Sequence, residues 1–107
     1  MNPYCDFEGI GLIPWAPIAG GALARPVNAQ ASTVRGEGMV KNGGLSDSDK
    51  EIVNRVEEVA KKKGWTMAQV ATVWSISKVS SPIIGFSSVY FLLSKSVQYE
   101  ILIFVAD

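Results

Sequence analysis

Two short apolar runs on either side of two helical segments constrain this fold most. Residues 10–15 (IGLIPW) and residues 83–86 (IIGF) are apolar on both faces and are bounded by turn-forming residues. Because such a run suits a strand covered on both sides, each run predicts a strand in a parallel sheet. Pro14 favours a strand end or a bulge at its position. Strand, helices and strand in this order predict an α/β fold with a parallel strand pair.

Both helical segments between the runs have clear start and stop signals. Residues 48–51 (SDKE) form a candidate capping box, and Ser46 is a competing N-cap. A lysine run followed by Gly64 is typical of a helix end, because the helix dipole favours cations there and glycine accepts the left-handed cap. Residues 66–69 (TMAQ) form a second capping box. The second helix is expected to end near Lys78, before a serine–serine–proline sequence.

Two further segments are assigned from weaker patterns. Residues 1–9 are short, polar and end in glycine, which is typical of the tail of a helix or its exit loop. Residues 27–44 contain four glycines and show little periodicity. The second segment is therefore expected to be a long loop, and loops beyond about 12–15 residues are usually functional covers or disordered connections.

Composition removes several function classes. The chain has 107 residues, ten basic and ten acidic side chains, one cysteine and no histidine. Balanced charge argues against nucleic acid or an anionic membrane as a partner, and no apolar stretch reaches the roughly 20 residues of a spanning helix. The lone Cys5 favours a reducing, cytoplasmic location and excludes a cysteine-rich metal site. Without histidine, no catalytic triad, histidine-based metal site or imidazole acid–base group is expected, and no metal is predicted.

The segments after the two apolar runs are the candidate binding sites. Residues 16–21 (APIAGG) and 85–88 (GFSS) offer backbone N–H groups without bulky side chains, and the second segment adds two hydroxyls. Ligands in parallel α/β folds bind beyond the carboxyl ends of strands, and free N–H groups there can hold phosphate oxygens. Neither the P-loop pattern nor the dinucleotide-binding glycine pattern occurs. From spacing alone, phosphate binding and ordinary turns both remain open.

A family resemblance favours the first alternative. Residues 9–21 (GIGLIPWAPIAGG) resemble the seventh-strand segment of the aldo-keto reductase superfamily, most closely its fungal NADP-dependent branch. Residues 44–71 and 81–89 continue the resemblance in register. It implies that residues 1–89 are the C-terminal strands 7 and 8, with their helices, of a partial (β/α)8 TIM barrel. Residues 90–107 are then a divergent hydrophobic tail that is not native to the family.

The resemblance also implies a cofactor and the residues that bind it. Members reduce aldehydes and ketones to alcohols with NADP(H), so the implied partners of the intact protein are NADP(H) and a small carbonyl substrate. On the pyrophosphate side, the implied binding residues are Ala16, Pro17, Ile18, Ala19 and Gly21. On the side of the adenosine 2′-phosphate, they are Gly85, Ser87 and Ser88.

The sequence departs from the family pattern at several points. Ala16 stands where the family commonly has serine, and residues 90–93 (YFLL) replace the usual basic residues after Val89. Arg25 is the only nearby basic candidate to replace them. The family's catalytic tetrad of Asp, Tyr, Lys and His belongs to earlier strands, so no catalytic residue is assigned and the chain is expected to be inactive alone.

Two other interpretations stay open. The chain could be a non-enzymatic nucleotide-binding or regulatory fragment that keeps the phosphate-facing turns. It could also be a truncated gene-model product without an independent function. In that case residues 90–107 would come from an unspliced intron or a frame shift, whereas the alternative is a genuine divergent C-terminal strand.

Overall fold

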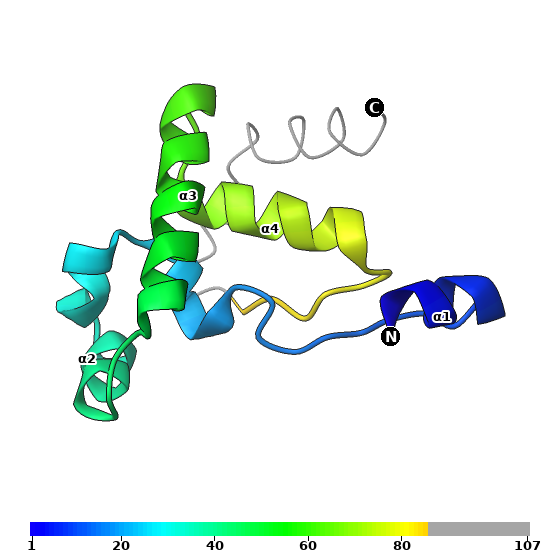
Figure 1. Ribbon diagram of the computed structural model, residues 1–107, viewed down its shortest axis with the longest axis horizontal. Helices are drawn as coiled ribbons and strands as arrows, with labels where there is room; N and C mark the ends of the chain where they lie inside the picture. The colour runs from blue at the N-terminus through cyan, green and yellow to red at the C-terminus, as the bar shows by residue number, and fades with distance from the viewer. Residues whose placement is uncertain (86–107) are drawn as a thin grey trace. The chain divides into compact units, whose positions relative to one another are not determined.

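The computed structural model describes residues 1–85, and it is mostly helical (Figure 1). The chain forms two compact units, one joining Met1–Pro17 to the segment that starts at Thr72, the other formed by Ile18–Ala71. In chain order, the helices are α1 (Asn2–Glu8), the 3-10 helices η1 (Ala19–Ala24) and η2 (Val27–Ser32), α2 (Val34–Lys41), α3 (Asp47–Lys63) and α4 (Met67–Lys78).

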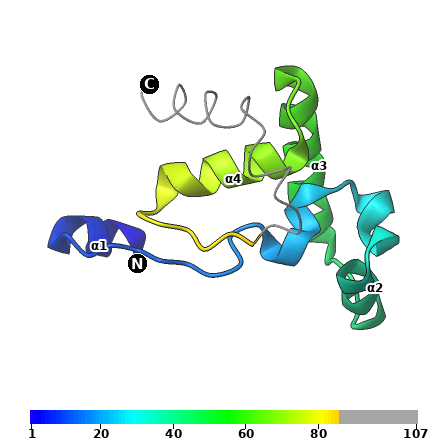
Figure 2. The same ribbon diagram turned by 180° about the vertical axis from the view of Figure 1, so that it is seen from behind.

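In the first unit, the two apolar runs lie alongside each other in a parallel direction, as Figure 2 shows. The Ser81 N–H donates to the Leu12 carbonyl at 3.1 Å, and the Ile83 N–H donates to the Pro14 carbonyl at 2.9 Å. Trp15 and Ile83 form an isolated parallel bridge. The predicted parallel direction is therefore confirmed.

The prediction of two strands is wrong for the described residues, which contain this bridge but no strand. Two local features interrupt a ladder. Pro14 has no N–H to donate, and the Leu12 N–H donates to the side-chain hydroxyl of Ser80 at 3.0 Å instead of to a backbone carbonyl. Phe86, the last residue of the second predicted strand, lies outside the described residues.

The first unit also contains the N-terminal helix and most of α4. Gly9 ends α1 in the left-handed conformation, with φ of 70°, so residues 1–9 are the helix tail that the sequence predicts. Cys5 is buried on α1, as expected of an ordinary structural thiol. On α4, Val73 and Ser75 are buried, and the Ser75 hydroxyl donates to the Pro17 carbonyl at 3.3 Å.

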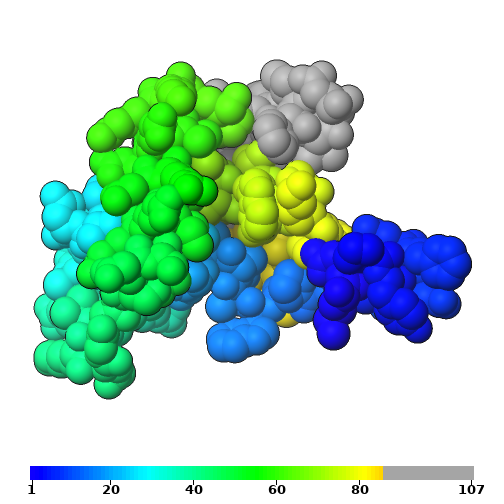
Figure 3. Space-filling model, viewed as in Figure 1, coloured from blue at the N-terminus to red at the C-terminus, as the bar shows by residue number. Residues whose placement is uncertain are grey.

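The second unit has a small apolar core around α3. Val53, Ala60 and Met67 are buried, and the half-buried side chains packed on them are Leu23, Val27, Leu45, Val56 and Val70. The predicted apolar stripe of α3 is only partly buried, since Ile52 remains 51% exposed. Figure 3 shows α3 at the surface, in green. The core of this unit is therefore narrow, and much of the apolar surface of α3 has no cover within residues 1–85.

Local capping sets both ends of α3 and the start of α4. Ser46 is the N-cap of α3: its hydroxyl accepts from the Asp49 N–H at 3.2 Å, and its own N–H donates to the Asp49 carboxylate at 3.1 Å. The competing cap was thus correct and the box at residues 48–51 was wrong. The earlier start places both Asp47 and Asp49 in the first turn, where the helix dipole favours anions. The predicted Gly64 cap is confirmed, with φ of 67°.

The second capping box is confirmed as predicted. The Gln69 N–H donates to the Thr66 hydroxyl at 3.2 Å, and the Thr66 N–H donates to the Gln69 side-chain oxygen at 2.8 Å. Helix α4 ends at Lys78, also as predicted.

The prediction of a long loop over residues 27–44 is wrong, because η2 and α2 occupy most of it. Thr33 caps α2 by accepting from the Gly36 N–H at 3.2 Å. Gly36 is required by packing: a Cβ on it would lie 1.8 Å from the Gln30 carbonyl oxygen. A glycine that serves a close approach of two backbones therefore lowers the helix propensity of this segment and explains why local sequence patterns do not predict α2.

Candidate nucleotide-binding turn

The predicted site residues fall into three groups. Ala16, Pro17 and Gly85 lie in the first unit, whereas Ile18, Ala19 and Gly21 lie in the second. Ser87 and Ser88 lie outside the described residues.

In the first unit, the parallel bridge aligns the ends of the two apolar runs. Trp15 pairs with Ile83, so Ala16–Pro17 and Ile84–Gly85 both leave the pair at its carboxyl end. The Ser75 hydroxyl holds the Pro17 carbonyl. Ala16 has φ of 47°, a left-handed conformation that alanine rarely adopts. Such strain costs roughly 1–2 kcal/mol and persists only where the surroundings impose it.

In the second unit, residues 18–21 form a tight turn with an unusual backbone. Ile18 has φ of −103° and ψ of 24°, and φ is 52° at Ala19, 64° at Gly20 and 100° at Gly21. The Gly21 N–H donates to the Ile18 carbonyl at 3.1 Å. A right-handed residue followed by a left-handed one directs successive N–H groups to one side, which creates a concave anion-binding arrangement called a nest.

Two N–H groups of this nest have no acceptor within residues 1–85. Those of Ala19 and Gly20 donate to no other group in the part of the chain that the structure describes. Ala19 is exposed and Gly20 is half-buried. The turn can therefore offer two backbone donors to an anion without first breaking a hydrogen bond within residues 1–85.

A guanidinium lies next to this turn. Arg25 is half-buried, and its Nη1 donates to the Thr33 hydroxyl at 2.9 Å. A Cβ on Gly21 would lie 3.2 Å from Arg25 Nη2, so this side chain packs against Gly21. No carboxylate lies within 4.0 Å of Arg25 among the described residues. The sequence singled out Arg25 as the nearby cation, but not which part of the turn it contacts.

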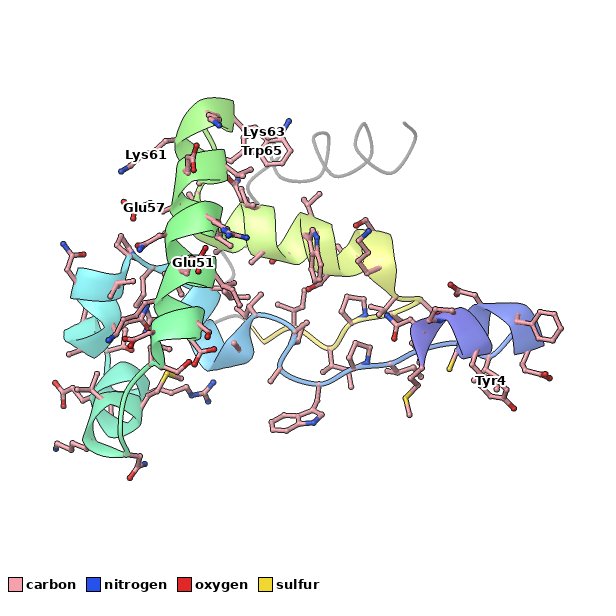
Figure 4. All side chains as sticks on the ribbon, viewed as in Figure 1. Tyr4, Glu51, Glu57, Lys61, Lys63 and Trp65 are labelled. Carbon is pink, nitrogen blue, oxygen red and sulfur yellow. The ribbon has the colours of Figure 1, made fainter. Side chains whose placement is uncertain are left out.

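Four of the five carboxylates of α3 are engaged in ion pairs on its surface, and the fifth, Asp49, belongs to the capping box. Glu51, Glu57 and Lys61 are labelled along this helix in Figure 4. The four pairs are Lys50–Asp47 at 3.1 Å, Lys61–Glu57 at 2.9 Å, Lys62–Glu58 at 2.9 Å, and Arg55–Glu51. The hydrogen bond and charge of Lys62 hold the pKa of Glu58 below its usual range, while Glu58 raises the pKa of Lys62. These two shifts favour the charged forms of Glu58 and Lys62, so this pair is not poised for proton transfer.

Three further observations bear on chemistry and location. Within residues 1–85, no group of three histidine, cysteine, aspartate or glutamate side chains is placed to hold a metal ion. Tyr4, labelled in Figure 4, is 63% exposed on α1. No helix in the described segment is both long and apolar enough to cross a membrane. The nest at residues 18–21 is the candidate binding site in this segment.

Comparisons with known proteins give this turn a family context. An aldo-keto reductase of Fusarium vanettenii is 46% identical over 93 residues, which are 83% of this chain and 25% of that protein. The versiconal hemiacetal acetate reductase of Aspergillus parasiticus is 50% identical over 94 residues, covering 82% and 27% of the two chains. An aldo-keto reductase of Metarhizium robertsii is 43% identical over 93 residues, covering 83% and 25%. The chain thus spans about a quarter of the length of these relatives.

The family model named "Aldo/keto reductase family" matches residues 1–99. This match extends past residue 89, where the resemblance in the sequence was expected to end; the boundary between a family segment and a divergent tail stays a prediction. A match over most of the chain, together with the fungal relatives, assigns the family. The chain belongs to the aldo/keto reductase family.

Proposed function

We propose that this chain is the cofactor-binding C-terminal part of an NADP(H)-dependent aldo-keto reductase. In this proposal residues 10–15 and 83–86 correspond to strands 7 and 8 of a (β/α)8 barrel. The parallel bridge between Trp15 and Ile83 is the observation that carries it. In such barrels the ligand binds at the carboxyl ends of the strands, often with a phosphate site after strands 7 and 8.

The residues after Trp15 suit a nucleotide phosphate. The N–H groups of Ala19 and Gly20, which have no acceptor among the described residues, are suitable donors to an anion, and Gly21 adds no side chain that would block it. Gly85, Ser87 and Ser88 would face the adenosine 2′-phosphate, as the resemblance implies. When bound, NADPH supplies the hydride that reduces an aldehyde or ketone; the residues assigned here bind and orient its phosphates.

Exposed apolar side chains of the first unit favour part of a larger domain over a self-sufficient module. Trp15 is 83% exposed, Ile13 68% and Ile83 58%, although all three lie on the paired runs. Strands of a closed barrel are covered by side chains inside and by helices outside. Such a surface, which is rare on a separate soluble domain, is expected where further strands and helices would pack.

The chain is proposed to be inactive without the rest of the barrel. Carbonyl reduction by the family requires a tyrosine general acid with lysine and histidine beside it. This sequence has no histidine. Tyr4 is exposed, and no ion pair or hydrogen bond links its side chain to another described residue. The proposal therefore assigns cofactor binding, and not hydride transfer, to this chain.

A binding and turnover experiment on the purified full chain tests both parts. Calorimetric titration with NADP⁺ is expected to show saturable binding, whereas incubation with NADPH and an aromatic aldehyde is expected to leave the absorbance at the NADPH band constant. Failure to bind any dinucleotide would refute the cofactor-binding role. Aldehyde-dependent oxidation of NADPH by the chain alone would refute its inactivity.

A further inference from the structure

We propose that a cavity between η2, α2 and the start of α3 binds a short hydroxy acid, that is, a molecule with an apolar chain between a hydroxyl and a carboxylate. The cavity has a volume of about 170 Å³, and all the residues that line it belong to the second unit. It shares no residue with the nest at residues 18–21, so this inference does not depend on the proposed function.

Among the lining residues, Gln30 supplies a buried acceptor without a donor. Gln30 is only 5% exposed, and its Nε2 donates to the carbonyls of Ala22, Arg25 and Pro26 at 3.0, 3.0 and 3.2 Å. These three acceptors fix the orientation of the amide, because a flipped amide would place its oxygen against them. Oε1 accepts no hydrogen bond within residues 1–85. Since a buried acceptor without a donor carries a desolvation penalty, a hydroxyl that donates to Oε1 is stabilised.

The other walls of the cavity are mostly apolar, and its size limits the occupant. These walls are lined by Val27, Met39, Val40 and Leu45, together with Gly44. A single water needs only roughly 10–15 Å³ and two to four polar partners, so this cavity is too large and too apolar to be the site of one water. It is smaller than the roughly 300–1,000 Å³ of pockets for drug-sized ligands. The fitting occupant is therefore a short molecule with an apolar middle.

Lys50 supplies a cation to the same cavity. Its side chain is 47% exposed, whereas the other three ion-paired cations of α3 are 71–76% exposed. This is typical of a lysine whose stem lies along apolar surface while its ammonium group reaches water. Its partner Asp47, at 3.1 Å, is fully exposed, so a ligand carboxylate can share the ammonium without displacing a buried group. Of the described residues that line the cavity, none carries a carboxylate that would repel the ligand.

The acceptor, the apolar walls and the cation together select the chemistry of the ligand. An alcohol can donate to Gln30 Oε1 and fill the apolar space, but it leaves Lys50 unused. A simple carboxylate can fill the space and face Lys50, but it leaves Oε1 without a donor. A hydroxy acid uses all three features, and it is therefore the class of ligand that this cavity fits best.

The test is an NMR titration of the full chain, with isotope-labelled methionine methyl groups, by 6-hydroxyhexanoate, hexanoate and hexanol. Met39 lines the cavity, whereas Met1 and Met67 do not and are the internal controls. The hydroxy acid is expected to shift the Met39 signal saturably and to bind about fivefold more tightly than hexanoate. This factor lies within the roughly two- to tenfold contribution of a hydrogen bond between neutral groups.

Two lysine variants test the charged end of the site. Lys50→Gln is compared with Lys61→Gln, which removes an ion-paired lysine near the other end of the same helix (Figure 4). Lys50→Gln is expected to weaken the binding of 6-hydroxyhexanoate and hexanoate by about two- to fivefold, the range of an exposed charge pair, and to leave hexanol binding unchanged. Lys61→Gln is expected to change none of the three affinities. Circular dichroism checks that both variants keep their helix content.

Equal affinities for 6-hydroxyhexanoate and hexanoate would overturn the role of Gln30 as the acceptor. Equal effects of the two lysine variants, or an equal loss of hexanol binding in Lys50→Gln, would overturn the role of Lys50 as the partner of the carboxylate. Binding that leaves the Met39 signal unchanged would place the ligand elsewhere and overturn the site. Absence of binding by all three probes would overturn the whole inference and leave the proposed dinucleotide-binding function standing.

Discussion

Replacing Gly36 with alanine tests the close backbone contact between α2 and η2. The new Cβ would lie 1.8 Å from the Gln30 carbonyl oxygen, whereas an ordinary contact begins at 3.4 Å. Both groups belong to backbone, so no side-chain rotation relieves the clash. Alanine at residue 36 therefore requires α2 and η2 to move apart. Overpacking of this kind typically costs about 1–3 kcal/mol.

Gly38→Ala is the matched control, because it introduces the same methyl group into the same helix. No atom lies within 4 Å of its added Cβ. Alanine is favoured over glycine inside a helix by about 1 kcal/mol, so this variant is expected to stabilise α2. The two variants should therefore differ by about 2–4 kcal/mol and have effects of opposite sign.

Amide hydrogen exchange over residues 34–41 measures the difference locally and does not require cooperative unfolding of the whole chain. Gly36→Ala is expected to accelerate exchange in α2, and Gly38→Ala to slow it. If both alanines slow exchange equally, the close approach of Gly36 to Gln30 is refuted, and with it the explanation of why glycine occurs at residue 36.

Three further predictions concern the caps, the pH dependence and the turn. Ser46→Ala is expected to destabilise α3 by about 1 kcal/mol in thermal melts followed by circular dichroism. The control Ser48→Ala removes no capping hydroxyl and is expected to change the stability little. Equal effects of the two variants would refute the assignment of the cap. Hydrogen bonds from the Ser46 side chain and backbone lower the pKa of Asp49 below its ordinary value of 3.8. The ionised carboxylate therefore stabilises the folded state at pH values above 3.8, and this stabilisation is lost as the pH falls through the lower folded-state pKa. Exchange in the first turn of α3, corrected for intrinsic rates, should therefore rise on acidification in the wild type and not in Asp49→Asn. Gly21→Ala is expected to weaken pyrophosphate binding more than Gly43→Ala does. Both positions have positive φ, but only a methyl group at residue 21 would contact Arg25. Equal affinities of the two variants for pyrophosphate would count against a binding site at this turn.

Local sequence signals predicted the features that depend on residues three or four positions apart. Both helix starts depend on a hydroxyl and a side chain at this spacing, so Thr66 with Gln69 could be assigned directly. For α3 the same rule produced two candidates, Ser46 and Ser48, and spacing alone could not separate them. Gly64 followed from the same local logic.

Features that depend on distant contacts were not accessible in this way. The carbonyl that makes Gly36 necessary is supplied by Gln30, and the helix around it has no periodic apolar pattern to compensate for its glycines. The apolar runs predicted a parallel direction correctly, but a strand also needs a ladder of partners, and only Trp15 and Ile83 form a bridge within the described residues. The contact of Arg25 with Gly21 likewise depends on Thr33, eight residues further along the chain.

The left-handed conformation of Ala19 limits which sequences can replace this turn during evolution. A β-branched residue cannot adopt φ of 52° without a severe steric penalty, whereas glycine, asparagine or aspartate can. Drift at this position is thus confined to a few small or short polar residues, regardless of what the turn binds. A replacement by aspartate would also place a negative charge on the nest, so a lineage that depends on anion binding has a still narrower choice of residues.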